Sequence, residues 1–127
     1  MKKIGFVGLG HMGGPMAINI AKKSPVPLVV YDPSPKAMAA VTAAGAQAAK
    51  SPKDVADQAE IVIACLRPLD VNINVALGKD GVIHGSAIRI YVETSTMGQK
   101  TADTILEGLD RKSTRLNSSH GYISYAV

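Results

Sequence analysis

Residues 3–13 read KIGFVGLGHMG, a short apolar run followed by glycines in the spacing G-x-G-x-x-G. The apolar run predicts a buried strand, and residues 13–23 predict a helix that begins at the last glycine of the motif. In a strand–turn–helix unit of this kind Gly8 permits the tight turn, Gly10 leaves room for a pyrophosphate, and Gly13 allows the helix to pack closely. The stretch predicts a dinucleotide-binding loop, and the alternative is a glycine-rich turn without a ligand.

Beyond this loop, apolar runs of strand length alternate with helical patterns. The further predicted strands are residues 28–32, 61–66 and 88–93, and the predicted helices are residues 34–44, 51–59, 70–77 and 98–109. Ser34 and Ser51 each precede a proline, so each serine is a suitable N-cap and the proline suits the first helical position. Asp54 is placed to return the capping hydrogen bond to Ser51. The alternation is typical of the α/β class, with a Rossmann-type, doubly wound parallel sheet.

Asp32 ends the second predicted strand, about 20 residues after the glycine loop. A carboxylate at this position accepts hydrogen bonds from the hydroxyls of the adenosine ribose, and it repels the 2′-phosphate of NADP. The chain continues with Pro33 and Ser34, and Lys36 is the nearest cation beyond the strand. The sequence therefore predicts NAD as the cofactor, with NADP less favoured. The alternative is that Asp32 only begins a turn before Pro33.

Composition narrows the remaining classes of protein. The chain of 127 residues is 46% hydrophobic and 19% charged, which suits one globular domain. Aromatic residues make up only 4%, and the net charge of +4 is not gathered into a basic stripe, so we predict no nucleic-acid partner. Cys65 is the single cysteine, and we interpret it as a buried, inert thiol within a strand. We also predict no metal site, no membrane contact and a cytoplasmic location.

Residues 6–19, FVGLGHMGGPMAIN, resemble the signature G-L-G-x-M-G-x-x-M-A-x-N of the β-hydroxyacid dehydrogenases. That family includes 3-hydroxyisobutyrate dehydrogenase, tartronate semialdehyde reductase and, more distantly, 6-phosphogluconate dehydrogenase. Generic dinucleotide binding does not demand Met12, Met16 or Asn19, so these residues make the resemblance specific. The two methionines either line the nicotinamide end of the pocket or fill gaps in the core.

Two further segments carry the same resemblance. Residues 61–68, IVIACLRP, are similar to the family's strand and loop V-I-x-x-L-P, and residues 93–96, ETST, are similar to its D-x-S-T. Arg67 and Glu93 depart from the family pattern and leave the substrate open. The resemblance implies a contact of Ser95 with the substrate carboxylate. The expected cofactor-binding residues are Gly8, Leu9, Gly10, His11, Met12, Gly13, Asp32, Leu66, Arg67, Pro68 and Thr96.

The last stretch of the chain breaks the α/β pattern. Residues 110–120 read DRKSTRLNSSH, have no apolar periodicity and resemble the translation of a sequencing-adapter oligonucleotide; residues 123–127, ISYAV, match its continuation. The alternative is a native polar tail. We therefore predict an incomplete NAD(P)-binding Rossmann domain in residues 1–109 and a non-native tail in residues 110–127. One edge of the sheet is then expected to be exposed.

Together the patterns and the resemblance predict the cofactor-binding half of an oxidoreductase that transfers a hydride between NAD and a small 3-hydroxy acid. In the family resembled, the part that corresponds to this chain is followed by a general acid/base lysine and by an all-helical second domain that mediates dimerisation. We therefore predict no catalytic acid/base residue in this chain, no turnover by it alone, and a homo-oligomeric parent enzyme. Two alternatives stay open: an imine or pyrroline reductase, and a non-catalytic NAD-binding module.

Overall fold

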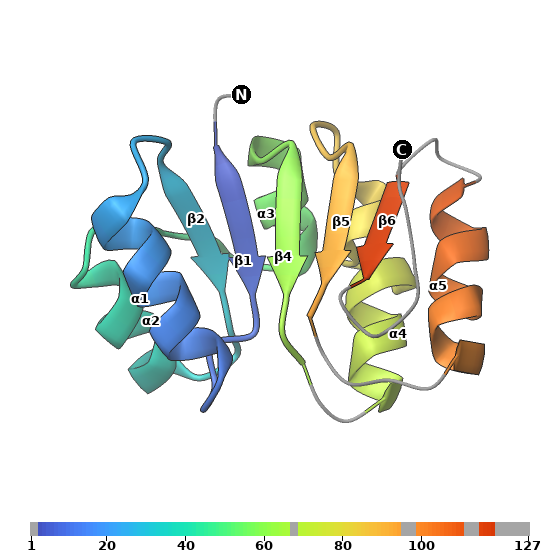
Figure 1. The fold of residues 1–127 in the computed structure, drawn as a ribbon, viewed down its shortest axis with the longest axis horizontal. Coiled ribbons are helices and arrows are strands. Elements are labelled where there is room, and N and C mark those ends of the chain that lie inside the picture. Colours follow the sequence, from blue (N-terminus) through green and yellow to red (C-terminus); the bar gives the residue numbers. More distant parts are fainter. Residues whose placement is uncertain (1–2, 67–68, 95–98, 111–114, 119–127) are drawn as a thin grey trace.

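The computed structural model describes residues 3–66, 69–94, 99–110 and 115–118. Within these ranges, six strands form one parallel sheet (Figure 1). The strands are β1 (Ile4–Val7), β2 (Leu28–Tyr31), β3 (Gln47–Ala48), β4 (Ile61–Ala64), β5 (Ile90–Glu93) and β6 (Arg115–Ser118). Their order across the sheet is β3-β2-β1-β4-β5-β6. The direction of the chain across the sheet reverses between β1 and β4, and open α/β sheets bind ligands at such a switch point.

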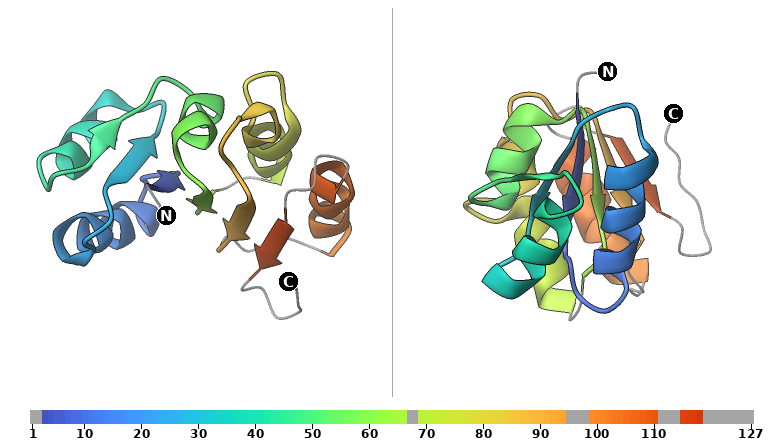
Figure 2. Two further views of the ribbon diagram at one scale, coloured as in Figure 1. Left: turned by 90° about the horizontal axis from the view of Figure 1, so that it is seen from above. Right: turned by 90° about the vertical axis from the view of Figure 1, so that its left-hand side faces the viewer.

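Helices cover both faces of the sheet. They are α1 (Gly13–Lys23), α2 (Pro35–Thr42), α3 (Pro52–Gln58), α4 (Leu69–Leu77) and α5 (Gln99–Asp110), with a short 3₁₀ helix η1 (Val82–His84). α1 and α2 pack on one face, and α3, α4 and α5 pack on the other (Figure 2). The chain runs outward from β1 to β3 and then outward from β4 to β6. Right-handed crossovers therefore place the helices of the two halves on opposite faces.

Alternate residues of the central strands fill two apolar clusters. On β1, Phe6 belongs to the cluster beneath α1 and α2, and Val7 belongs to the cluster beneath α3, α4 and α5. Both side chains are almost completely buried. Successive residues of a strand point to opposite faces, so a strand covered on both sides needs a continuous apolar run. This is the pattern that the sequence shows at β1, β2 and β4.

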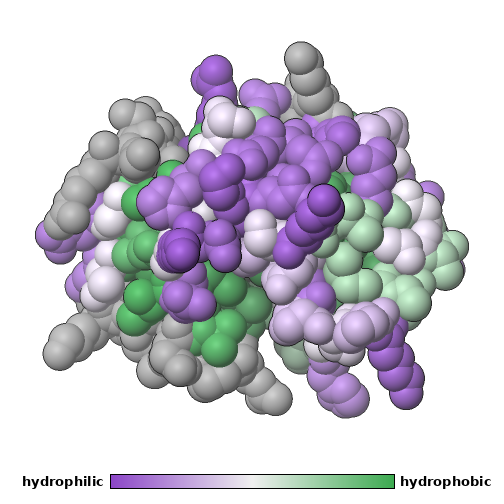
Figure 3. Space-filling view, turned by 180° about the vertical axis from the view of Figure 1, so that it is seen from behind, coloured by the Kyte–Doolittle hydropathy of each residue, from purple (hydrophilic) through white to green (hydrophobic). Residues whose placement is uncertain are grey.

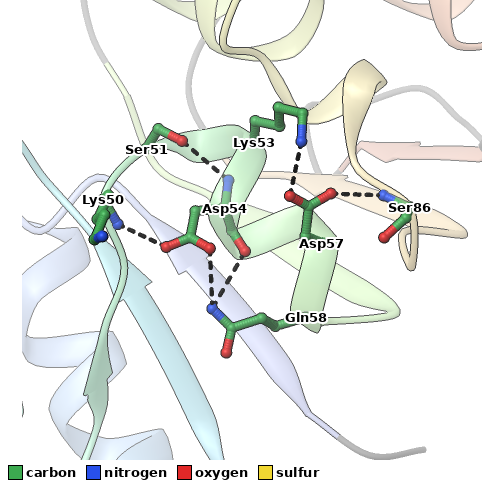
Figure 4. Close-up of polar contacts among 7 residues, drawn as sticks. All are labelled: Lys50, Ser51, Lys53, Asp54, Asp57, Gln58 and Ser86. Carbon is green, nitrogen blue, oxygen red and sulfur yellow. Dashed lines mark hydrogen bonds and ion pairs between the residues drawn. The ribbon is translucent and has the colours of Figure 1, made fainter.

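Serine side chains cap α2 and α3 as predicted. Ser34 Oγ accepts a hydrogen bond from the backbone N–H of Ala37 at 3.3 Å, and Ser51 Oγ accepts one from the backbone N–H of Asp54 at 3.0 Å. The Asp54 carboxylate accepts from the backbone N–H of Lys50 at 2.9 Å (Figure 4). The predicted hydrogen bond from the Ser51 backbone N–H to Asp54 is therefore wrong, because the N–H that donates to Asp54 belongs to Lys50, one residue earlier. The extended backbone at Ser51 brings the preceding N–H within reach of Asp54 instead.

Two strands have no counterpart in the predictions from sequence. β3 is a two-residue edge strand whose residues are both exposed. β6 lies at the opposite edge and pairs in parallel with β5, from Ile90 with Arg115 to Glu93 with Ser118. No strand was predicted within residues 110–127, and β6 forms there because strand pairing joins backbone groups and needs no apolar pattern. The edge of β5 that we expected to be exposed is thereby paired.

Candidate cofactor-binding site

The loop between β1 and α1 has a geometry that only glycine allows at two positions. Gly8 lies in the left-handed region with φ of 98°, and a Cβ there would collide with the carbonyl oxygen of Cys65. A Cβ on Gly13 would collide with the carbonyl oxygen of Gly8, so α1 packs directly on the exit of the strand. Gly10 differs from both, because it is exposed and a Cβ there would meet no atom within 4 Å. Gly10 therefore faces space that a ligand can occupy.

The N-terminus of α1 has no side-chain cap. Met12 stands at the N-cap position, and its side chain makes no capping hydrogen bond. The structure describes the whole first turn of α1, and this turn contains no acidic residue. By contrast, Ser34 and Ser51 cap α2 and α3. Backbone N–H groups at an uncapped helix start, together with the positive end of the helix dipole, suit a phosphate group.

Asp32 joins the glycine loop to the start of α2. Its Oδ2 atom accepts a hydrogen bond from the backbone N–H of Leu9 at 2.8 Å, and its Oδ1 atom accepts one from the backbone N–H of Ser34 at 2.8 Å. The residue is only half-buried. A carboxylate oxygen has two lone pairs, so each oxygen keeps an acceptor position for a ribose hydroxyl. Asp32 thus begins the turn before Pro33 and remains able to bind a ribose.

The residues present fit an NAD molecule. Gly10 and the start of α1 would hold the pyrophosphate, and Asp32 would hold the adenosine ribose. His11 and Met12 are exposed beside the loop, Met12 with 71% of its surface accessible. Met16 is also exposed. Neither methionine fills a gap in the core, and their place at the nicotinamide end of the pocket stays a prediction.

The end of β4 lies against the glycine loop. β4 ends at Ala64, so Cys65 and Leu66 lie in the loop that follows, and both are half-buried. The interpretation of Cys65 as a buried thiol within a strand is therefore wrong. The backbone N–H of Cys65 donates to the carbonyl oxygen of Val7 at 3.0 Å, which ties the loop to β1.

The end of β5 is joined to the end of β4 through Thr94. The backbone N–H of Thr94 donates to the carbonyl oxygen of Ala64 at 2.9 Å, and its side-chain Oγ1 donates to the same oxygen at 2.8 Å. Sequence reasoning assigned no role to Thr94. Four of the predicted site residues lie outside the described part of the chain, and their roles stay predictions: Arg67, Pro68, Ser95 and Thr96.

Three buried polar side chains lie on the side of the sheet covered by α3, α4 and α5. Tyr91 and Glu93 of β5 and Asn72 of α4 are fully buried. Burial raises the pKa of Tyr91 well above its ordinary value, and the neighbouring Glu93 carboxylate raises it further. Among the residues that the structure describes, the Asn72 amide and the Tyr91 hydroxyl have no hydrogen-bond partner. Sequence reasoning noted Glu93 only as a departure from the family and missed this group, although alternate residues of a strand share a face.

Other features of the molecule lie apart from the glycine loop. His84 is exposed at the end of η1. A pocket at α4 is lined by Val71, Ile73, Asn74, Leu77 and Gly78, so neither the glycine loop nor Asp32 is part of this lining. Figure 3 shows apolar surface on the side of the molecule turned away from the viewer in Figure 1. Within the described ranges, no group of three or more His, Cys, Asp and Glu side chains could hold a metal ion. No helix in this part of the chain combines the length and apolar character needed to cross a membrane.

Comparison with known proteins identifies the family of this chain. Residues 3–116 match the family described as the NAD binding domain of 6-phosphogluconate dehydrogenase. The chain belongs to this family of NAD-binding domains. Membership confirms the resemblance carried by the glycine loop, and it confirms NAD as the cofactor class.

Two curated relatives are dehydrogenases. The NAD-dependent L-serine dehydrogenase of Pseudomonas aeruginosa is 38% identical over 106 residues, which are 83% of this chain and 35% of the relative. The 3-hydroxyisobutyrate dehydrogenase of the same organism is 35% identical over 113 residues, 88% of this chain and 38% of the relative. The chain thus spans little more than a third of the length of these two relatives.

Solved structures share the fold. The 3-hydroxyisobutyrate dehydrogenase of Mycobacterium tuberculosis superposes with a TM-score of 0.80 at 22% identity, over 94% of this chain and 40% of that protein. An imine reductase from Myxococcus stipitatus superposes with a TM-score of 0.80 at 13% identity, over 93% of this chain and 40% of that protein. At these identities the likeness shows the fold alone, and it confirms the predicted Rossmann-type sheet.

Proposed function

We propose that this chain is the cofactor-binding half of an oxidoreductase that transfers a hydride between NAD and a small 3-hydroxy acid. The observation that carries the proposal is the Asp32 carboxylate, which is bonded to the glycine loop at Leu9 and keeps acceptor positions for a ribose. L-serine and 3-hydroxyisobutyrate, which the names of two relatives specify, are both 3-hydroxy acids, and this supports the substrate class.

The nicotinamide would supply the hydride chemistry, and this half would supply binding and orientation. In the proposal Leu66, Arg67 and Pro68 approach the cofactor, Thr96 lies near the nicotinamide, and Ser95 binds the substrate carboxylate. The proposal assigns no proton-transfer step to a residue of this chain. We therefore expect the 127-residue chain to bind NAD without oxidising a hydroxy acid. A homo-oligomeric parent enzyme and a cytoplasmic location belong to the same proposal.

The cofactor preference is tested by titrating the chain with NADH and NADPH and following the fluorescence of the reduced nicotinamide. We expect NADH to bind more tightly, because the Asp32 carboxylate repels the 2′-phosphate of NADPH. Asp32→Asn keeps the shape of the side chain and removes its charge. It is expected to weaken NADH binding by roughly tenfold and to narrow the preference between the two dinucleotides.

Asp103→Asn is the matched control for this titration. Asp103 is exposed on α5, at the other end of the sheet from β2, and the substitution removes the same charge (Figure 1). Its affinity for both dinucleotides should equal that of the unaltered chain. Equal affinity of the unaltered chain for NADH and NADPH would contradict the assignment of Asp32.

The substrate class is tested on the gene read beyond the codon for Leu109 and expressed at the length of the relatives. NAD reduction with 3-hydroxyisobutyrate or L-serine would support the proposal, and the 127-residue chain serves as the control without turnover. Reduction of a cyclic imine without oxidation of either hydroxy acid would contradict it and favour a reductase.

A further inference from the structure

Backbone hydrogen bonds join the strand ends at the switch point in series. The bonds run from Gly8 to Tyr31 at 3.1 Å, from Cys65 to Val7 at 3.0 Å, and from Thr94 to Ala64 at 2.9 Å, each from an N–H to a carbonyl oxygen. They connect β2 to β1, β1 to β4, and β4 to β5. A displacement at one strand end is therefore passed to the next.

The link between β4 and β5 differs because a side chain strengthens it. Thr94 Oγ1 donates a hydrogen bond at 2.8 Å to the Ala64 carbonyl that already accepts from the Thr94 N–H. Both lone pairs of this carbonyl oxygen are then filled. The side chain is half-buried and β-branched, so its χ1 angle has few alternatives. The threonine side chain holds the end of β4 in one position relative to β5.

The segment that follows Ala64 lies next to the glycine loop. The carbonyl of the next residue, Cys65, lies so close to Gly8 that a Cβ on this glycine would collide with it, and a Leu66 methyl carbon would be only 2.9 Å away. The segment after β4 therefore packs closely against the loop at Gly8. In a doubly wound sheet the two halves each bind one mononucleotide, so with the adenosine half at Asp32 the nicotinamide half falls on the side of β4 and β5.

We propose that Thr94 is a positioning residue for the nicotinamide half of the cofactor. Its hydroxyl fixes the end of β4 to β5, and through Cys65 it fixes the wall of the site next to Gly8. This inference rests on the NAD-binding function proposed above. It adds a residue to which neither the glycine motif nor the resemblance to the dehydrogenases assigns a role.

The test compares NAD with ADP, which contains the adenosine and pyrophosphate alone, by isothermal titration. Thr94→Val keeps the shape of the side chain and removes only the Oγ1 hydrogen bond. We expect it to weaken NAD binding about 3–10-fold and to leave ADP binding unchanged. Thr94→Ser restores the hydroxyl and should restore the affinity for NAD. Thr42→Val is the matched control, since it removes a hydroxyl bond to the Ala39 carbonyl on the exposed side of α2.

Three results would contradict the positioning role of Thr94. Unchanged NAD affinity in Thr94→Val overturns the proposal, and so does an equal loss for NAD and ADP, which indicates a general disturbance of the site. Failure of the unaltered chain to bind either nucleotide overturns the proposed function, and this inference falls with it. If circular dichroism shows that Thr94→Val does not fold, Thr94→Ala removes the same hydroxyl with less bulk and carries the same expectations.

Discussion

A methyl group at Gly13 would collide with the Gly8 carbonyl, whereas a methyl group at Gly10 would meet no atom within 4 Å. Gly13→Ala is therefore expected to destabilise the fold by about 1–3 kcal/mol, as overpacking does. Gly10→Ala should leave the Tm nearly unchanged and weaken NAD binding by roughly tenfold, because its methyl group would stand where the pyrophosphate approaches. Thermal unfolding and NAD titration separate the two effects. A Gly10→Ala chain with unchanged affinity would show that the pyrophosphate lies elsewhere.

At the scale of single residues, sequence predicts the parts of the site whose cause is local. The glycines and Asp32 could be placed because a turn, a helix start and a strand end determine their roles within a short stretch of chain. Thr94 could not be placed, because its partner Ala64 is 30 residues away and becomes a neighbour only when β4 and β5 pair. The burial of Asn72 could not be predicted either. This residue comes from α4 and reaches the side of Tyr91 and Glu93 only when α4 packs on the sheet.

Among the elements, α3 is tied to the segment after η1 through Asp57. This carboxylate accepts hydrogen bonds from Lys53 Nζ at 2.8 Å and from the backbone N–H of Ser86 at 2.9 Å (Figure 4). Burial alone would raise the pKa of Asp57, but the hydrogen bonds from Lys53 and Ser86 outweigh it and lower the pKa below its ordinary value. The folded state therefore favours the ionised form. Its contribution to stability is present above the unfolded pKa and is lost as the pH falls through the folded one.

Asp57→Asn is accordingly expected to lower the free energy of unfolding by about 1 kcal/mol near pH 7, and the difference should shrink below about pH 4. Urea unfolding at the two pH values measures this directly. Asp103→Asn, an exposed position on α5, is the control for the loss of one charge. If Asp57→Asn unfolds like the unaltered chain near pH 7, the bonds to Lys53 and Ser86 add nothing to stability.

Helices were easier to predict than strands for a physical reason. α1 spans the predicted residues 13–23, and Ser34 and Ser51 cap the helices that they were predicted to cap. These signals are local. A strand ends where its pairing ends, so the apolar run at 61–66 did not reveal that β4 stops at Ala64. β3 and β6 were missed because their pairing joins backbone groups, and the sequence carries no mark of it.

For the molecule as a whole, β6 completes one edge of the sheet. The apolar side chains that the structure describes in the two clusters come from residues 4–109. β6 is joined to the sheet by its parallel pairing with β5. We expect β6, which lies in the tail predicted to be non-native, not to be required for the fold, because backbone pairing along one edge joins it to the sheet.

A chain ending at Asp110 tests this expectation. It should fold, bind NAD with unchanged affinity and unfold at a Tm lower by roughly 4–8 °C, the shift that the loss of about 1 kcal/mol produces in a domain of this size. Its β5 edge would present unpaired backbone groups, so it should self-associate as its concentration rises in analytical ultracentrifugation. A chain ending at Ser118 keeps β6 and should associate no more than the unaltered chain. If the chain ending at Asp110 does not fold, β6 is integral to the domain. A tail that is not part of the native protein is not expected to be required for folding. Failure to fold would therefore contradict the prediction that residues 110–127 are non-native.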